Sequence, residues 1–357
     1  MKIVCDLSVT SAPFHPAVAT AQAAWGAPWE SPVTATPASL VLDFAAGAYG
    51  SDGAPAGLSS LMAFSRTSAA SVIDASGLLV GAPADTARLT HDPVSRARLG
   101  LLLETSRSNL FADSASPASQ TVSVTATPHV LSFYGTGSVT LSGAYASVVT
   151  GSAAYPARTE VSFVPTAGSL TLTLSGQIQA PQLEVGGTAS SYIPAVTAPG
   201  LRADDNASVA LGPWFGSDAG TLVFSGYVAG ASANDRIIEI DNGTAATRLS
   251  LLWNNVLGKP QFQVWNGGAL QAAIAPPGNS VPLGTEFRVA VAYGPDTFAI
   301  SLNGGGVAND TSGTVPAGVN TLRLGRAAGG AQGLIVAESL VYYPTRLANS
   351  ELQALSA

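Results

Sequence analysis

The stretch LIVAESLVYY, residues 334–343, continues into PTRLANSELQAL, residues 344–355, and contains the clearest change of structural pattern in the chain. The first segment is rich in Val, Ile, Leu and Tyr, which favour strands. Within the second, LANSELQAL, residues 347–355, is the most convincing helical segment, with Asn349 or Ser350 as its N-cap. The pattern therefore predicts a strand that leads into a short helix.

The region before this strand contains more strand segments separated by turns. The turn signals are Asn242-Gly243, Asn266-Gly267 and Asn303-Gly304. We therefore interpret residues 201–357 as one antiparallel β-domain. Its other expected strands are 221–228 (TLVFSGYV), 236–241 (RIIEID), 247–254 (TRLSLLWN), 261–266 (QFQVWN), 286–293 (EFRVAVAY), 297–304 (TFAISLNG) and 320–325 (NTLRLG).

A second region of strand segments covers residues 105–200. Residues 120–145 and 158–176 alternate apolar and polar side chains, with turns around 135–137 and 167–169. Strands of this length and spacing favour an antiparallel sandwich or jelly roll. We expect this region to be a separate β-domain.

The N-terminal region, residues 1–104, is less regular. Several prolines interrupt residues 1–60, where one strand is expected with Leu40, Leu42 and Phe44 on one face. Residues 71–80, SVIDASGLLV, predict a hairpin that turns at residues 74–77. Trp25 and Trp29 either anchor the chain on a partner or fill a small local core.

The composition agrees with an all-β protein and argues against several other classes. The chain is 46% hydrophobic and 10% charged, with 38 Gly and 23 Pro. Its net charge is −7, with 13 Arg and only 2 Lys, which argues against a nucleic-acid-binding surface. No apolar run is long enough for a membrane helix, so we expect no membrane insertion. The N-terminus also lacks the apolar core of a secretory signal.

Metal and disulfide chemistry find little support in the sequence. Cys5 is the single cysteine, which excludes an internal disulfide framework. His15, His91 and His129 are far apart and lack partners at zinc-ligand spacing. We therefore expect no cofactor and no transition-metal site.

Several short motifs follow one another between residues 64 and 110. They comprise Phe64, Arg66, Asp74 and Gly77-Leu78, then RLTHDP at 88–93, then GLLLETSRSNL at 100–110. In this order they resemble a segment common in phage tail and fibre proteins. Ser108 stands where that segment usually has Thr.

Two later regions also resemble parts of phage proteins. Residues 180–205, APQLEVGGTASSYIPAVTAPGLRADD, resemble the end of the carbohydrate-binding modules that follow this motif, although the domain here is shorter. The strand order that ends in residues 322–355 resembles the concanavalin-like, laminin-G-like lectin fold. The expected fold is all-β, with an irregular N-terminal attachment segment and two antiparallel jelly-roll or lectin-like β-sandwich domains.

Glu239 and Asp241 raise the question of catalysis. They are two residues apart on an expected strand, about 6.6 Å along the backbone, whereas a retaining glycosidase needs two carboxyl groups about 5–5.5 Å apart. Concanavalin-like glucanases, which the fold resembles, have a second Glu two or three residues after the Asp. Here those positions are Gly243 and Thr244, so we expect no catalytic residue.

Two other interpretations of these acids remain open. The first is structural: Asp241-Asn242-Gly243 is a favourable turn, and Glu239 then lies on a solvated strand face. The second is a calcium contact supplied by Asp241, Asn242 and Asn254, although the spacing does not demand an ion. Glu286 and Glu338 are distant in sequence and could approach Glu239 only through the fold.

Strand alternation suggests where a sugar could bind. On the strand at residues 261–266, Phe262 and Val264 are expected to face the core. Gln261, Gln263 and Trp265 are expected to face the solvent. Trp253 is expected in the core. The candidate sugar surface is Trp265, Gln263, Asn266, Asn254 and Asn255. Alternatively, Trp265 covers a sheet edge or contacts another subunit, and Tyr134, Tyr145 and Tyr155 are equally plausible contacts in the second domain.

These observations and resemblances imply a non-catalytic fibre or spike subunit of a phage-like or gene transfer particle. It would bind host surface polysaccharide for adsorption and contact other particle proteins through its N-terminal region. We expect a homo-oligomer at the particle surface, assembled in the host cytoplasm. The alternatives are a polysaccharide depolymerase and a purely structural base or decoration subunit.

Overall fold

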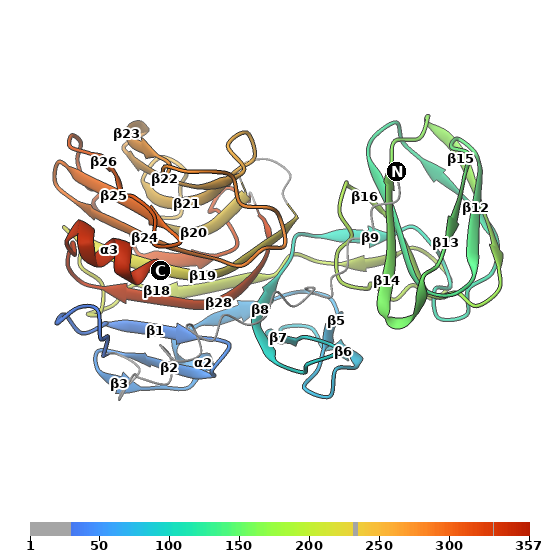
Figure 1. Ribbon diagram of the computed structural model, residues 1–357, viewed down its shortest axis with the longest axis horizontal. Helices are drawn as coiled ribbons and strands as arrows, with labels where there is room; N and C mark the ends of the chain where they lie inside the picture. The colour runs from blue at the N-terminus through green and yellow to red at the C-terminus, as the bar shows by residue number, and fades with distance from the viewer. Residues whose placement is uncertain (1–29, 231–234, 331) are drawn as a thin grey trace.

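The computed structural model describes residues 30–230, 235–330 and 332–357 of the chain. It contains two antiparallel β-sandwiches, joined by a narrower region of strands (Figure 1). The all-β prediction is therefore confirmed. Trp25 and Trp29, and the first 29 residues of the expected attachment segment, lie outside the described residues.

The larger sandwich consists of two facing sheets. Among the described residues, the first sheet has ten strands in the order β26-β25-β24-β19-β28-β1-β2-β3, and β8 pairs with both β28 and β7. Their bounds are β26 Ala308–Asp310, β25 Thr297–Leu302, β24 Phe287–Gly294, β19 Gly220–Gly230, β28 Leu334–Tyr343, β1 Leu40–Asp43, β2 Ala48–Ser51, β3 Ala54–Pro55, β8 Arg98–Leu103 and β7 Arg88–His91.

The second sheet of this sandwich has seven strands within the described residues, in the order β23-β22-β21-β20-β27-β18-β4. Their bounds are β23 Ala269–Ile274, β22 Lys259–Asn266, β21 Arg248–Asn254, β20 Asp235–Asp241, β27 Thr321–Leu324, β18 Asn206–Ala210 and β4 Ala63–Ser65. Each strand expected in residues 201–357 is present in one of the two sheets.

The core between the two sheets follows the predicted alternation. Phe262 and Val264 on β22 are buried, and Trp253 on β21 is buried beside them, as expected. Leu40, Leu42 and Phe44 enter the same core from the N-terminal region. Burial of large apolar side chains is the main stabilising contribution, at about 1.5–3 kcal/mol for each.

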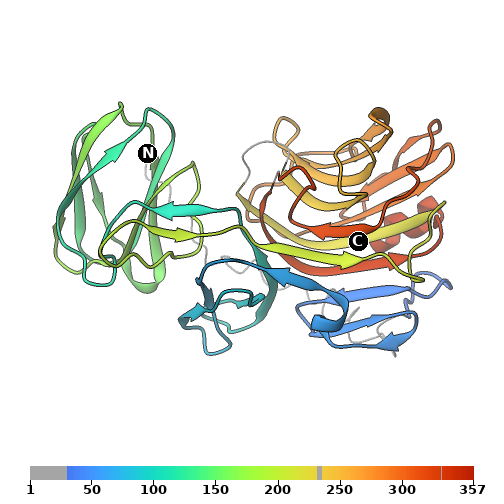
Figure 2. The same cartoon turned by 180° about the vertical axis from the view of Figure 1, so that it is seen from behind.

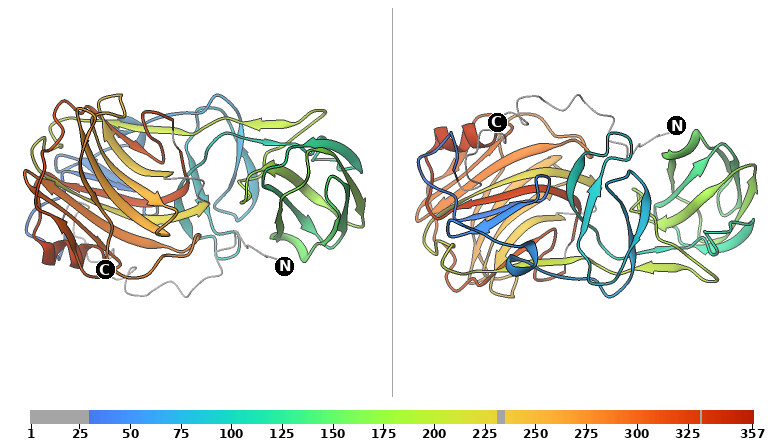
Figure 3. Two further views of the ribbon diagram at one scale, coloured as in Figure 1. Left: turned by 90° about the horizontal axis from the view of Figure 1, so that it is seen from above. Right: turned by 90° about the horizontal axis from the view of Figure 1, so that it is seen from below.

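Part of the N-terminal region is built into the larger sandwich. β1 pairs with β28, so that Val41 lies opposite Val341, and β8 pairs with the same edge of β28 further along, while β19 occupies the other edge. In the view from below, the blue strand β1 lies along the red strand β28 (Figure 3). The proposed divisions at residues 104/105 and 200/201 stay predictions. The pairings show that residues 40–103 supply strands to the larger sandwich.

The smaller sandwich is formed by residues 110–197. Within the described residues, a four-stranded sheet, β10-β15-β12-β13, faces a three-stranded sheet, β14-β11-β16. Phe133, Leu141 and Leu172 are among the residues of its core. The strands are β10 Gln120–Val124, β15 Gly168–Ser175, β12 Ser138–Gly143, β13 Ser147–Thr150, β14 Ala153–Phe163, β11 His129–Gly135 and β16 Gln179–Val185.

Two paired strands and one hairpin occupy the region between the sandwiches. β9 (Arg107–Asn109) and β17 (Gly200–Arg202) pair with each other and run between the two lobes (Figure 2). The hairpin of β5 (Ala70–Ile73) and β6 (Leu79–Ala82) confirms the turn predicted at residues 74–77. Asp74 stabilises that turn, because its Oδ1 accepts hydrogen bonds from the Ser76 and Leu78 amides, each at 2.9 Å.

The helices are short. α2 covers Leu58–Leu61, and α3, Asn349–Leu355, packs Leu352 and Leu355 on the outer face of the ten-stranded sheet. The predicted N-cap was wrong: Ala348 holds that position, and its amide donates to Glu351 Oε2 at 2.7 Å. Asn349 instead accepts a hydrogen bond from Arg346. In the described part of the chain, no helix is long and apolar enough to cross a membrane.

Candidate functional site

Trp265, Gln263 and Gln261 share the outer face of the seven-stranded sheet. The strict alternation of β22 buries Phe262 and Val264 and leaves the intervening side chains half-buried at the surface. This part of the sequence prediction is confirmed. The outer face of β22 is therefore a row of one indole and two amides.

Arg248 covers part of the Trp265 ring. The two residues lie opposite each other on β21 and β22, and the guanidinium carbon is 4.9 Å from the ring centroid. A cation over an indole face is attractive by about 0.5–1 kcal/mol when exposed. The contact holds the ring in place, and a sugar could stack only on the part of the ring that Arg248 leaves free.

Hydrogen bonds connect three of the predicted side chains through a fourth. Trp265 Nε1 donates to Gln263 Oε1 at 3.3 Å, and Gln263 Nε2 donates to Gln261 Oε1 at 3.1 Å. Asn254 Nδ2 donates to the same Gln261 oxygen at 3.1 Å. Gln261 was not among the candidate site residues, although its outward orientation was expected.

The remaining two candidates lie at opposite ends of this row. Asn255 is exposed in the turn after β21, whereas Asn266 ends β22 and donates to Thr314 Oγ1 at 2.9 Å. Asn254 lies opposite Lys259, seven residues before Asn266, which is about 23 Å along a strand. The five predicted residues therefore form an extended line and not a compact pocket.

Glu239 lies on the same outer face, two strands away from this row, but it is buried, so the expectation of a solvated strand face was wrong. Its side chain is 1% exposed. One carboxylate oxygen accepts the Ala328 amide at 2.9 Å, and the other accepts Arg236 Nε at 2.7 Å and Ser250 Oγ at 2.9 Å. Ser250 lies opposite Glu239 on β21, Arg236 is three residues earlier on β20, and Ala328 belongs to the loop between β27 and β28.

Asp241 is also bound by protein groups. Arg323 Nε lies 2.7 Å from Asp241 Oδ2, and the Gly243 amide donates to Oδ1 at 2.7 Å. Gly243 has φ +86°, so the expected turn is confirmed. Asn254 lies at the other end of β21 from this turn, so the suggested calcium ligands are not brought together. Among the described residues, no group of three His, Cys, Asp or Glu side chains is suited to a metal.

Glu338 belongs to the ten-stranded sheet, and Glu286, which directly precedes β24 of that sheet, interacts with it. Glu338 is on β28, and Ser225 Oγ donates to its Oε2 at 2.5 Å. Burial and, to a smaller extent, the neighbouring Glu286 carboxyl together raise the pKa of Glu338 to about 7. The fold thus pairs two acids that the sequence argument considered only as possible neighbours of Glu239.

Residues of the 64–110 motif form a buried charge network with Arg202 and Asp205. Arg66 and Arg88 bind the two oxygens of Asp205 at 3.0 and 2.5 Å. Glu104 lies 2.6 Å from Arg88 and 3.2 Å from Arg202. Burial alone would raise the pKa of Glu104, but Arg202 and Arg88 outweigh it and hold that pKa at about 2. These charges tie the N-terminal strands to the connection between the sandwiches.

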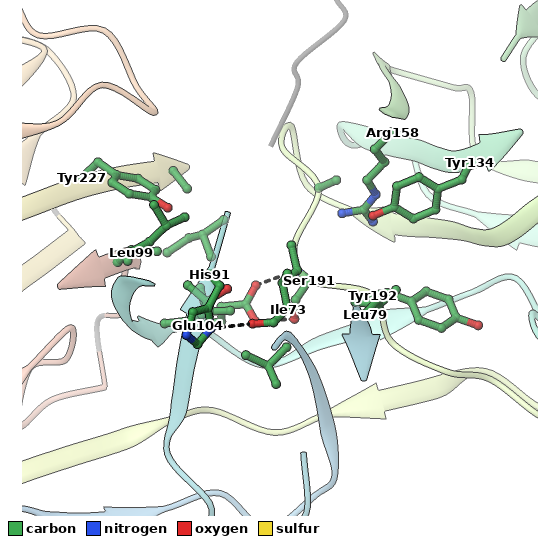
Figure 4. Close-up of a pocket in the computed structure, with 17 residues that line it drawn as sticks. Ile73, Leu79, His91, Leu99, Glu104, Tyr134, Arg158, Ser191, Tyr192 and Tyr227 are labelled. Atoms are coloured by element: carbon green, nitrogen blue, oxygen red, sulfur yellow. Dashed lines mark hydrogen bonds between the residues drawn. The ribbon is translucent and has the colours of Figure 1, made fainter. Parts of the chain in front are cut away.

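A cavity of about 80 Å³ lies beside this network, where the hairpin and the two sandwiches meet (Figure 4). Its walls are largely apolar and include three tyrosines, Tyr134, Tyr192 and Tyr227. Of these, only Tyr134 was a candidate contact from the sequence. The cavity depends on contacts between segments far apart in the chain, which strand periodicity does not reveal.

The solved structures to which this chain is similar share little of its sequence and match only part of it. No family model matches the chain, and neither does any curated protein. The chain is similar to the CBM40 of the Ruminococcus gnavus IT-sialidase bound to α2,3-sialyllactose, at 19% identity and TM-score 0.35, over 40% of this chain and 84% of that one. It is also similar to the NanB sialidase from Streptococcus pneumoniae, at 14% identity and TM-score 0.34, over 40% of this chain and 25% of that one.

Proposed function

We propose that this protein binds polysaccharide without cleaving it, through the outer face of the seven-stranded sheet. The observation that carries the proposal is the hydrogen-bonded row of Trp265, Gln263, Gln261 and Asn254. An indole offers an apolar platform for a sugar ring, and planar amides both donate and accept hydrogen bonds. A line of such groups suits an extended chain of sugars better than a single one.

The state of Glu239 supports a non-catalytic role. A general acid or nucleophile must reach the substrate, but this carboxylate is buried and bound by Arg236, Ser250 and the Ala328 amide. Asp241, its neighbour on the strand, is held by Arg323. The described surface around Trp265 therefore supplies binding groups and no accessible pair of carboxyl groups.

The biological setting that we propose is the surface of a phage-like or gene transfer particle, on which the protein is a fibre or spike subunit. This rests on the motif at residues 64–110, whose Arg66, Arg88 and Glu104 form the buried network. Repetition of a weak sugar site in a homo-oligomer would raise the avidity for host capsule. The N-terminal region would contact other particle proteins.

Binding to encapsulated and capsule-free host cells tests this function. We expect the native protein to prefer encapsulated cells, and Trp265→Ala to lose at least tenfold in binding, since stacking on an aromatic ring carries much of such an interaction. Gln263→Ala should weaken binding less. Gln353→Ala, which removes an exposed amide on α3, is the matched control and should bind as the native protein does.

Three outcomes would contradict the proposal. Equal binding to both kinds of cell would exclude capsule recognition. Release of oligosaccharides from host polysaccharide, abolished by Glu239→Gln, would establish a depolymerase. Failure of the native protein to bind any host glycan, combined with loss of particle assembly on deletion, would establish a structural subunit.

A further inference from the structure

The floor of the cavity in Figure 4 is a row of side chains on the ten-stranded sheet. Tyr227 lies opposite Val336, and Val336 lies opposite Leu102 on its other side. Their sequence neighbours Val228, Ile335 and Leu101 enter the core of the larger sandwich. The row therefore occupies the reverse face of the sheet, away from that core.

Two other parts of the chain enclose this floor. The β5–β6 hairpin contributes Ile73 and Leu79, and the smaller sandwich contributes Tyr134 and Arg158. Tyr155 closes the contact between them, because its hydroxyl donates to the Gly77 carbonyl oxygen at 2.6 Å. The cavity is partly open to solvent, so a ligand has a route of entry.

Three polar groups on the cavity wall have no hydrogen-bond partner among the described residues. They are the Tyr227 hydroxyl, the Thr90 hydroxyl and His91 Nε2, on side chains that are each at least nine-tenths buried. His91 Nδ1 lies 3.2 Å from the Ile73 carbonyl oxygen, which leaves Nε2 to interact with a ligand. Figure 4 shows the Tyr227 hydroxyl directed toward the space between the walls.

The Tyr227, Thr90 and His91 side chains are largely buried, and their unbonded polar atoms can bind a ligand in the cavity that these residues line. Burial raises the pKa of Tyr227 well above its usual range, so its hydroxyl stays protonated and can donate. The groups thus supply hydroxyl donors and an imidazole nitrogen inside a mainly apolar cavity. Convergent polar groups in an apolar cleft are characteristic of small-molecule sites.

The charged residues on the wall are already neutralised. Glu104 is held by Arg88 and Arg202, and Ser191 donates to it through both its amide and its hydroxyl. The Arg158 guanidinium pairs with the Glu160 carboxylate at 3.8 Å, and it also donates to the Ser190 carbonyl and the Ser132 hydroxyl, each at 2.7 Å. A neutral ligand therefore fits this cavity better than an ionic one.

The size of the cavity limits the ligand to about one ring. A cavity needs about 10–15 Å³ to hold one water molecule, and this cavity has a volume of about 80 Å³. The space therefore holds several waters, or one six-membered ring with small substituents. A ring that places an apolar substituent against Leu79 and Val336 and hydroxyls toward Tyr227 and His91 would match both kinds of wall.

We propose that the junction cavity binds one neutral deoxy sugar unit, with its methyl group and apolar ring face against the aliphatic wall and its hydroxyls on Tyr227, Thr90 and His91. The inference rests on the proposed glycan-binding function for its class of ligand. It concerns a second site, separate from the Trp265 surface. A terminal unit of a polysaccharide would enter the cavity, whereas the interior of the chain would lie on the sheet.

Methyl α-L-rhamnopyranoside, a 6-deoxyhexoside, is the probe for this site, with methyl α-D-glucopyranoside and phenol beside it. Saturation-transfer NMR on the full chain should detect the deoxy sugar more strongly than glucoside or phenol. Tyr227→Phe removes one hydroxyl and should weaken binding about fivefold, the effect of one hydrogen bond. Ala229→Leu adds a side chain at the cavity wall and should abolish binding.

Two controls separate this site from the sheet surface and from loss of folding. Tyr145→Phe removes a tyrosine hydroxyl in the smaller sandwich, outside the cavity lining, and should leave the probe bound. Trp265→Ala should also leave it bound, so the cavity can be tested even if the Trp265 surface binds no polysaccharide. Near-ultraviolet circular dichroism of each variant checks that the fold is retained.

Several results would overturn the inference. Unchanged binding in both Tyr227→Phe and Ala229→Leu would place the sugar elsewhere. Stronger binding of phenol than of the deoxy sugar would identify an aromatic ligand, and binding of no probe would leave the cavity to water. Loss of probe binding in Trp265→Ala would show that the sugar binds at the Trp265 surface and not at a separate site in the cavity.

Discussion

Arg88 lies 2.6 Å from Glu104, and both side chains are almost completely excluded from solvent. The pair lies where three parts of the chain meet: the N-terminal strands β7 and β8, the connecting strands and the smaller sandwich. Each guanidinium and carboxylate of this network is compensated by another, as burial of charge requires. The network therefore sets how firmly the two sandwiches are connected.

Glu104→Gln should destabilise the protein by about 3–5 kcal/mol, since removal of one partner leaves buried arginine charge uncompensated. Chemical unfolding at pH 7 measures the change. Arg326→Gln is the matched control, because Arg326 forms a partly exposed pair with Asp204 and such pairs contribute about 0–1 kcal/mol. A similar loss in both variants would contradict a special role for the buried network.

Acid should weaken the same junction over a defined range. The pKa of Glu104 falls from 4.5 to about 2 on folding, because Arg202 and Arg88 outweigh the effect of burial. Its stabilising contribution is therefore complete above about pH 4.5 and is lost as the pH falls toward 2. The difference in unfolding free energy between the native protein and Glu104→Gln should narrow in that range. A constant difference down to pH 2 would contradict this assignment.

Gly77 is expected to tolerate no side chain. Its φ is +76°, and an added Cβ would lie 2.4 Å from the Pro93 carbonyl oxygen. Gly53 has φ +75° with open space around it, so Gly53→Ala measures the backbone effect alone. We expect Gly53→Ala to cost about 1 kcal/mol and Gly77→Ala about 2–4 kcal/mol in unfolding experiments. Equal costs would show that the hairpin moves away from Pro93 without penalty.

The sequence predicted the parts of the fold that depend on local pattern. Alternation correctly assigned Phe262 and Val264 to the core and Gln263 and Trp265 to the surface. It also identified the buried face of the strand at Leu40–Asp43, though not its partner β28, about 300 residues later. Pairing partners are set by the whole fold, so a pattern within one segment cannot name them.

The candidate site could be predicted only in part, because several of its contacts also come from segments that are distant in sequence. Glu239 was expected on a solvated strand face next to the turn at Asp241-Asn242-Gly243, yet Arg236, Ser250 and the loop at Ala328 cover it. Arg248 could have been placed beside Trp265 by extending the register through the turn after Asn254. Tyr227 gave no such signal, because β19 is buried on both faces and its sequence lacks alternation.

Glu338 should make stability depend on pH in the opposite sense to Glu104. Burial, with the nearby Glu286 carboxyl, raises its pKa from 4.5 to about 7. Folding therefore favours the protonated form of Glu338, so its stabilising contribution is complete below about pH 4.5 and is lost as the pH rises through 7.

Glu338→Gln, a neutral isostere, should stabilise the protein by about 1–3 kcal/mol at pH 8.5 and should change its stability little at pH 4. Thermal unfolding at the two pH values measures this. Glu30→Gln, which replaces an exposed carboxyl, is the control, and a Glu338→Gln effect that is equal at both pH values would contradict the assignment.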